Sequence, residues 1–387
     1  MPTPTDILDL SAKETLANRD KSTIEDAGIR DAVAFVCRNI QNRAGVLLLA
    51  CLLAKVHKPT IDIRMPYTEI GSSDSYSGRT YDEAYIGPFV NKHQLPCNPT
   101  TAFLTPALRN RNAVLTKDLD LVGRPPELYR TVLELLSYVH EGNADAGALL
   151  REAIRVLFLV KVETELRMDS LLLGLKTASH TSIPLSSENI VRLIQQHLEC
   201  KRASRLPVLV VAAAYTAAEK QLGERIVPLE SHNAADLQTG SLGDVEVTLI
   251  NDDKVVTTYE MKMKRVVRED IDHALNKIRS GSHRVDNYIF ITTDVIESEI
   301  SKYAASLYDQ TGGIEFVVLD CLGFLRHFLH LFHRLRQAFL ESYQEFLLVE
   351  PDSAVRQELK EAFLALRQAA ESATAIDEEE DLSAPQI

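Results

Sequence analysis

Hydrophobic residues recur at three- and four-residue spacing through the first part of the chain. This spacing predicts helices within 11–58, 127–162 and 187–200, because positions three and four apart share one helix face. The stretch 46–56 is apolar enough to predict a buried helix. Between 64 and 127, turn-forming Gly, Pro, Ser and Asn predict a loop-rich segment. A long irregular segment in a compact protein is more often functional than idle.

The pattern changes after residue 205. Residues 206–222 predict an Ala-rich helix, and both 243–250 and 255–264 alternate apolar and polar residues with a period of two, which is typical of strands. The turn-forming residues Asn251, Asp252 and Asp253 between them predict a hairpin. A helix, a strand, a helix and a strand are then predicted near 268–278, 287–292, 297–308 and 314–319. This order predicts an α/β domain with a mixed sheet.

These patterns divide the chain into four predicted segments. They are a mostly helical and loop-rich region at 1–202, an α/β core at 203–322, C-terminal helices at 323–372, and an acidic tail at 373–387. The tail is predicted to be disordered because it combines a run of acidic residues with few apolar ones.

Composition narrows the class of protein. With 387 residues, 45% of them hydrophobic and 25% charged, the chain has the composition of a soluble globular protein. The net charge of -13 argues against coating of nucleic acid or an anionic membrane by bulk charge, although local basic patches can still hold DNA. The five cysteines are odd in number and far apart, which fits neither a disulfide framework nor a paired zinc site. With neither an export signal nor a membrane span predicted, we expect a cytoplasmic protein.

Candidate chemistry lies on the two strands of the predicted hairpin. Alternation places Glu260, Lys262 and Lys264 on one strand face and Met261 and Met263 on the other, toward a core. The hairpin returns Asp244 to the neighbouring strand, where its carboxylate can converge on that of Glu260. Two adjacent carboxylates repel each other, and a divalent cation such as Mg²⁺ offsets that repulsion.

Lys262 beside such an ion can orient or deprotonate a water and screen charge on a phosphate, so these residues are the parts of a phosphodiester hydrolase. A solvated strand face with exposed ion pairs is the alternative.

This arrangement resembles the PD-(D/E)xK nuclease superfamily, with Asp244, Glu260 and Lys262 at the motif positions and Gly243 in place of the motif proline. The segments YSGRTYDEAYI, NKHQLPCNPTTAFLTPALRNRN, HNAADLQTGSLGDVEV and YEMKMKRV resemble the SacI-type restriction endonucleases over most of 70–320. The resemblance implies a restriction-endonuclease-like core and a type II enzyme that cuts double-stranded DNA with Mg²⁺. It also implies an auxiliary acid from the preceding helix, for which Glu219 and Glu224 are both candidates.

Sequence-specific cleavage also requires side chains that reach base edges and phosphates. The loop-rich segment supplies forked and amide donors, and further candidates flank the two strands. The candidate DNA-binding residues are Arg79, Asn98, Thr100, Thr101, Arg109, Arg111, Asn112, Asn233, Gln238, Lys264 and Arg265. An ordinary polar loop, in which such residues only satisfy turns, is the alternative for each of them.

Besides this interpretation, the sequence leaves open a partner and several rival functions. The segment GSSDSYSGRT lacks the lysine of a phosphate-binding loop, so ATP-driven cleavage is not supported. Cutting both strands of a palindrome predicts a homodimer, for which the helices within 323–370 could supply an interface. The rival functions are a structure-selective repair or junction nuclease, a non-catalytic DNA-binding or protein-interaction module, and a helical scaffold without DNA affinity.

Overall fold

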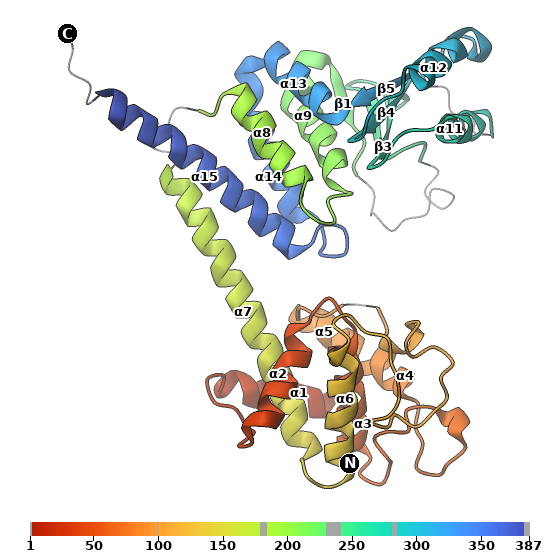
Figure 1. Cartoon of the computed structure of the whole chain (residues 1–387), viewed down its shortest axis with the longest axis vertical. Helices are drawn as coiled ribbons and strands as arrows, with labels where there is room; N and C mark the ends of the chain where they lie inside the picture. Colours follow the sequence, from red (N-terminus) through yellow and green to blue (C-terminus); the bar gives the residue numbers. More distant parts are fainter. Residues whose placement is uncertain (1, 99, 179–183, 230–240, 281–284, 383–387) are drawn as a thin grey trace. The chain divides into compact units, whose positions relative to one another are not determined.

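The computed structural model describes residues 2–98, 100–178, 184–229, 241–280 and 285–382. The chain forms two compact units, Met1–Leu166 and Arg167–Ile387. Figure 1 colours the first unit from red to yellow and the second from green to blue. Within the described ranges, no helix combines the length and the apolar character that crossing a membrane requires.

The first unit is built around one buried helix. Every residue of helix α3 (Ala44–His57) from Ala44 to Ala54 is buried, which confirms the predicted buried helix. Packed around it are α1 (Pro4–Ala17) and α6 (Glu127–His140), while α2 (Ala27–Arg38) contacts both α3 and α6. Helix α7 (Ala146–Ala178) begins in this unit and continues into the second.

The loop-rich segment of the first unit contains only short helical turns. They are η1 (Thr68–Ile70), α4 (Gly78–Tyr81), η2 (Asp82–Ile86), α5 (Gly87–His93) and η3 (Ala102–Leu104). Several of these turns contact α3 or one another, so the irregular chain is tied to the helical core.

The second unit contains a five-stranded sheet in the order β1-β2-β3-β4-β5. Its strands are β1 (Glu224–Ile226), β2 (Val245–Leu249), β3 (Val255–Lys262), β4 (Asn287–Thr292) and β5 (Glu315–Asp320). Strands β1, β2 and β3 pair antiparallel, whereas β3, β4 and β5 pair parallel. The predicted α/β class and mixed sheet are confirmed. Strand β1 was not predicted, because three residues are too few for an alternating pattern.

Helices cover both faces of this sheet. The apolar side chains of one face, among them Val245, Val247 and Tyr259, join a cluster with α8, α9, α13, α14 and α15. Alternate positions on the other face, among them Tyr288 and Phe290, pack with α11 and α12. The helices are α8 (Ser187–Leu198), α9 (Leu206–Leu222), α11 (Arg268–Ser280), α12 (Ser298–Thr311), α13 (Cys321–Leu331), α14 (Arg336–Val349) and α15 (Gln357–Leu382).

The unit boundary differs from the predicted segments. It lies between residues 166 and 167 instead of near 202, because the second half of α7 and helix α8 pack in the same apolar cluster as the sheet. The C-terminal helices belong to that cluster as well, with Phe339, Tyr343 and Phe363 fully buried. Much of the apolar surface that suggested a dimer interface is therefore used within the unit itself.

The predicted acidic tail begins within the last helix. Helix α15 continues to Leu382 and so overlaps the tail over 373–382, while 383–387 lies outside the described residues. Residues 373–382 contain Ala, Glu and Leu, which favour helices even when acidic neighbours accompany them.

Candidate functional site

Asp244 and Glu260 lie opposite each other on neighbouring strands. The β2–β3 register pairs Val245 with Tyr259, which places Asp244, one residue before β2, across from Glu260. The Asp244 amide donates to the Tyr259 carbonyl at 2.8 Å, and the Met261 amide donates to Asp244 Oδ2 at 2.7 Å. Opposite residues of an antiparallel pair have Cβ atoms roughly 5 Å apart, so the predicted proximity of the two acids has a geometric basis.

Gly243 explains why this chain has no proline before the aspartate. A Cβ atom at Gly243 would lie 2.5 Å from Thr258 Cγ2 and 2.6 Å from the Tyr259 carbonyl oxygen. Those distances are too short for any side chain, so only glycine lets the chain approach β3 closely enough to form the Asp244 hydrogen bonds.

Three charged side chains meet on the Glu260 face of β3. Lys262 Nζ lies 3.1 Å from Glu260 Oε1 and 3.3 Å from Asp270 Oδ1. The three side chains are only 22%, 23% and 16% exposed for Lys262, Glu260 and Asp270. Glu260 Oε2 also lies 3.2 Å from the Tyr288 hydroxyl, which can donate either to it or to the Leu242 carbonyl. Neither Asp270 nor Tyr288 was predicted as a site residue.

The two carboxylates determine the charge of Lys262. Partial burial lowers the pKa of the ammonium group, but the Coulomb interaction and hydrogen bonds with Glu260 and Asp270 outweigh it and raise the pKa above its ordinary value. Lys262 is therefore an ammonium group at neutral pH. Of the two roles expected for it, orienting a water fits this charge better than deprotonating one.

Glu246 shares the strand face of Asp244, but its carboxylate is hydrogen-bonded to the preceding turn. Its Oε1 accepts a hydrogen bond from the Leu242 amide at 2.6 Å and one from the Ser241 hydroxyl at 3.2 Å. The carboxylate thus fixes the chain that leads into β2, and this contact accounts for an acid at that position.

Neither upstream glutamate is placed beside the acidic pair. Glu224 begins β1 opposite Leu249, at the far end of β2 from Asp244, and five strand residues correspond to roughly 16 Å. Burial raises the pKa of Glu224. The negative charge of Glu224 contributes to a raised pKa of the Tyr215 and Tyr259 hydroxyls, which are hydrogen-bonded to each other. Glu219 is exposed near the end of α9, a helix that packs on the other face of the sheet.

The basic residues after β3 differ in their environments. Strand β3 ends at Lys262, so the exposed Lys264 does not continue the strand face, and Met263 is 40% exposed instead of lying in the core as expected. Arg265 pairs with Glu297 on the surface. Asn233 and Gln238 lie outside the described residues.

One loop candidate in the first unit, Thr101, helps to hold two loop segments together. Thr101 Oγ1 and the Ala102 amide both donate to the buried Asp82 carboxylate at 2.8 Å. A Cβ atom at Gly78 would lie 2.4 Å from the Phe103 ring, so the chain around Gly78 and the chain around Phe103 are also closely packed. Thr101 therefore serves the fold.

The remaining loop candidates are polar surface residues with different degrees of constraint. Arg79 pairs with Glu83 at 2.7 Å, with both side chains exposed. Asn98 accepts a hydrogen bond from the Thr100 amide at 3.2 Å, which is a turn-forming contact, and Thr100 itself is exposed.

In the segment 109–112, Arg111 anchors the loop, and Arg109 and Asn112 are exposed to solvent. Arg111 donates from Nε to the Ala107 carbonyl at 3.1 Å and from Nη2 to the Asp120 carbonyl at 3.0 Å. Arg109 and Asn112 are exposed, and Asn110 and Asn112 adopt φ values of 56° and 47°. The geometry brings Arg109 and Asn112 to the surface on a constrained loop.

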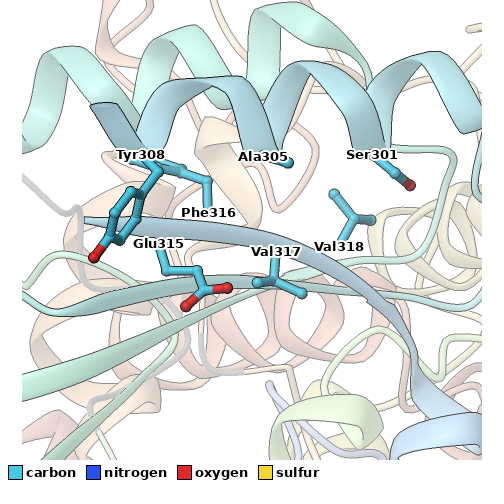
Figure 2. A pocket seen from close by; sticks show the side chains of 7 residues that line it. All are labelled: Ser301, Ala305, Tyr308, Glu315, Phe316, Val317 and Val318. Atoms are coloured by element: carbon cyan, nitrogen blue, oxygen red, sulfur yellow. The ribbon is translucent and has the colours of Figure 1, made fainter. Parts of the chain in front are cut away.

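A surface groove lies elsewhere on the second unit. It has a volume of about 420 Å³ between α12 and the edge strand β5. Figure 2 shows its lining residues, Ser301, Ala305, Tyr308, Glu315, Phe316, Val317 and Val318. None of these residues belongs to the Asp244–Glu260 pair, so the groove is separate from the candidate site.

Comparison with known families bears on the second unit. Residues 182–293 match the family described as the SacI restriction endonuclease C-terminal domain. This segment is therefore similar to the C-terminal domain of SacI-type restriction endonucleases. It contains Asp244, Glu260, Lys262 and Asp270, so these four charged residues of the candidate site all lie inside the match.

The match confirms the predicted SacI-type resemblance over 182–293, a shorter range than 70–320. A comparison with curated proteins found no match.

Proposed function

We propose that the chain is a type II restriction endonuclease with a PD-(D/E)xK core, which hydrolyses phosphodiester bonds at a specific site in double-stranded DNA with Mg²⁺. One observation carries the proposal. Asp244 lies opposite Glu260, with Lys262 on the face of Glu260, inside the segment that matches a restriction endonuclease domain.

The donor set of the site fits Mg²⁺. This ion is held in enzymes by one or two carboxylates together with waters and substrate phosphates. Among the described residues there is no group of three or more His, Cys, Asp or Glu arranged for a metal, so two carboxylates and the DNA phosphate are the expected ligands. Asp244 and Glu260 would hold the ion, and when bound it would supply Lewis-acid stabilisation of charge on the scissile phosphate.

The protein groups around the site have separate tasks in the proposed reaction. The Met261 amide fixes the Asp244 carboxylate, and the Tyr288 hydroxyl is placed to restrain Glu260. The Lys262 ammonium orients the attacking water and offsets negative charge that develops on the phosphate. No covalent enzyme intermediate is required, because water is the nucleophile.

Recognition is assigned to exposed donors outside the catalytic strands. Arg109 and Asn112 have the side-chain chemistry for guanine and adenine edges, and their loop is held by Arg111. Arg79 and the exposed Lys264 would contact phosphates. Cleavage of both strands of a palindrome would use a homodimer, and sedimentation showing a monomer both free and on cognate DNA would contradict that part of the proposal.

The test uses linear duplex phage DNA incubated with purified protein, with and without Mg²⁺. Discrete fragments that require the metal, and that disappear in the Asp244→Ala and Lys262→Ala variants, would support a site-specific endonuclease, and mapping the ends would give its site. Cleavage of branched but not linear duplexes would instead indicate a structure-selective nuclease. Metal-independent binding without cleavage would indicate a DNA-binding module.

A further inference from the structure

Asp270 is an acid whose position serves more than its helix. It lies in the first turn of α11, where Oδ2 accepts a hydrogen bond from the Val267 amide at 3.1 Å. Its other oxygen, Oδ1, lies 3.3 Å from Lys262 Nζ. One carboxylate therefore closes the turn before the helix and also contacts the catalytic lysine.

Burial separates Asp270 from an ordinary acid at a helix start. Its side chain is 16% exposed, whereas the adjacent Glu269 in the same turn is exposed to solvent. An acid that only interacts with the helix dipole gains little from being desolvated. The contact with Lys262 supplies a charge partner that offsets this desolvation.

The second carboxylate around Lys262 also has a consequence for the reaction. Glu260 has two tasks in the proposed function, since it contacts Lys262 at 3.1 Å and would also be a ligand of Mg²⁺. A carboxylate that turns toward a divalent cation interacts less strongly with an ammonium group beside it. Asp270 lies on a different element, so its contact with Lys262 does not depend on the orientation of Glu260.

We propose that Asp270 is a positioning residue that holds the Lys262 ammonium in its working place when Glu260 serves the metal. This inference rests on the proposed nuclease function. It assigns a role to a residue that lies eight positions after Lys262 and outside the Glu-Met-Lys motif itself.

The experiment compares Asp270→Asn, Asp270→Ala and Asp270→Glu with the control Glu269→Gln. Asparagine keeps an oxygen for the Val267 amide but loses the charge that faces Lys262, and the control removes one charge from the same helical turn. Single-turnover cleavage is measured with Mg²⁺, DNA affinity with Ca²⁺, and thermal stability without metal. A further readout is the ¹H–¹⁵N signal of the Lys262 ammonium, measured with Ca²⁺ and DNA bound so that Glu260 would serve the metal. A held ion pair protects this signal from exchange, and Lys262→Met identifies the signal by its loss.

The expected result is a 10- to 100-fold slower cleavage step in Asp270→Asn, of the order found when a group that orients an active-site ligand is removed. DNA affinity and thermal midpoint should stay near wild type, the Lys262 signal should be lost, and Asp270→Glu should recover part of the rate. Glu269→Gln should behave as wild type.

Three outcomes would overturn the inference. They are wild-type cleavage by Asp270→Asn, a rate loss that only follows loss of folded protein in both Asp270→Asn and Asp270→Glu, and an unchanged Lys262 signal in Asp270→Asn. If the wild-type protein cuts no DNA while its Lys262 signal still depends on Asp270, the proposed function fails and the catalytic role of Asp270 fails with it, but the ion pair stands.

Discussion

Replacing Gly243 by alanine should separate the two strands that carry the acidic pair. The new Cβ atom would lie 2.6 Å from the Tyr259 carbonyl oxygen, whereas ordinary contacts begin at 3.4 Å, so the chain must move by about 0.8 Å. Backbone of β3 cannot rotate away as a flexible side chain could. The displacement should weaken two hydrogen bonds. They are the one that the Asp244 amide donates to the Tyr259 carbonyl and the one that the Asp244 carboxylate accepts from the Met261 amide.

The expected cost follows from these contacts. Overpacking costs about 1–3 kcal/mol and each of the two weakened hydrogen bonds up to about 0.5–1.5 kcal/mol, so we expect the free energy of unfolding to fall by about 2–6 kcal/mol. Urea unfolding measures this quantity. Cleavage of duplex DNA should fall by a larger factor than stability alone explains, because Asp244 moves relative to Glu260.

Gly45→Ala is the matched control. It makes the same chemical change in helix α3, where the nearest atom to the added Cβ, the Val36 carbonyl oxygen, is 3.9 Å away. Stability should stay the same or rise, since alanine favours a helix more than glycine does. If Gly243→Ala unfolds at the wild-type urea concentration and cuts DNA within twofold of the wild-type rate, the reasoning about close strand approach is refuted.

Three further predictions concern the rest of the chain. Burial lowers the pKa of His197 from 6.5 to about 4, so the unfolded chain takes up a proton first and stability is lost as the pH falls below 6.5. Between pH 7 and pH 5 this single group should reduce the unfolding free energy by about 2 kcal/mol. His197→Gln should show a pH dependence smaller by that amount in urea titrations, and an unchanged dependence would contradict the assignment. Arg109→Ala should weaken DNA binding by about 1–3 kcal/mol in Ca²⁺ if Arg109 reads a base, with relaxed sequence preference as the signature, and full affinity for every sequence would exclude this role. Arg111→Ala should weaken binding too and should also open the 107–120 loop to limited proteolysis, a change that Arg109→Ala should not cause.

Local patterns in the sequence predicted the strands that carry the candidate site. Strand alternation placed Glu260 and Lys262 on one face and put Asp244 on the strand beside them, and the observed register agrees. The hairpin pattern is strong because two runs of period two flank a polar turn. The order of predicted helices and strands along the chain was sufficient to predict the fold class.

Contacts between distant elements were not visible in the sequence. Asp270 meets Lys262 because the loop after β3 folds back onto the strand, and no periodic spacing encodes that turn. Lys264 was placed on the strand face by alternation, but β3 ends where its pairing with β4 ends, at Lys262 opposite Thr292. The sequence makes Thr101 a DNA-binding candidate, since it does not reveal that the Thr101 hydroxyl donates to the buried Asp82 carboxylate.

The most direct test of the account compares Glu260→Gln with Glu246→Gln in single-turnover cleavage of duplex DNA with Mg²⁺. Both variants change one carboxylate to an amide of the same shape, but Glu260 lies beside Lys262, whereas Glu246 accepts from the Leu242 amide and can be replaced there by a glutamine oxygen. We expect a loss of at least about 100-fold for Glu260→Gln, in the range seen when a catalytic electrostatic partner is removed, and near wild-type cleavage for Glu246→Gln. Equal activity in the two variants would contradict the assignment of Glu260 to the reaction.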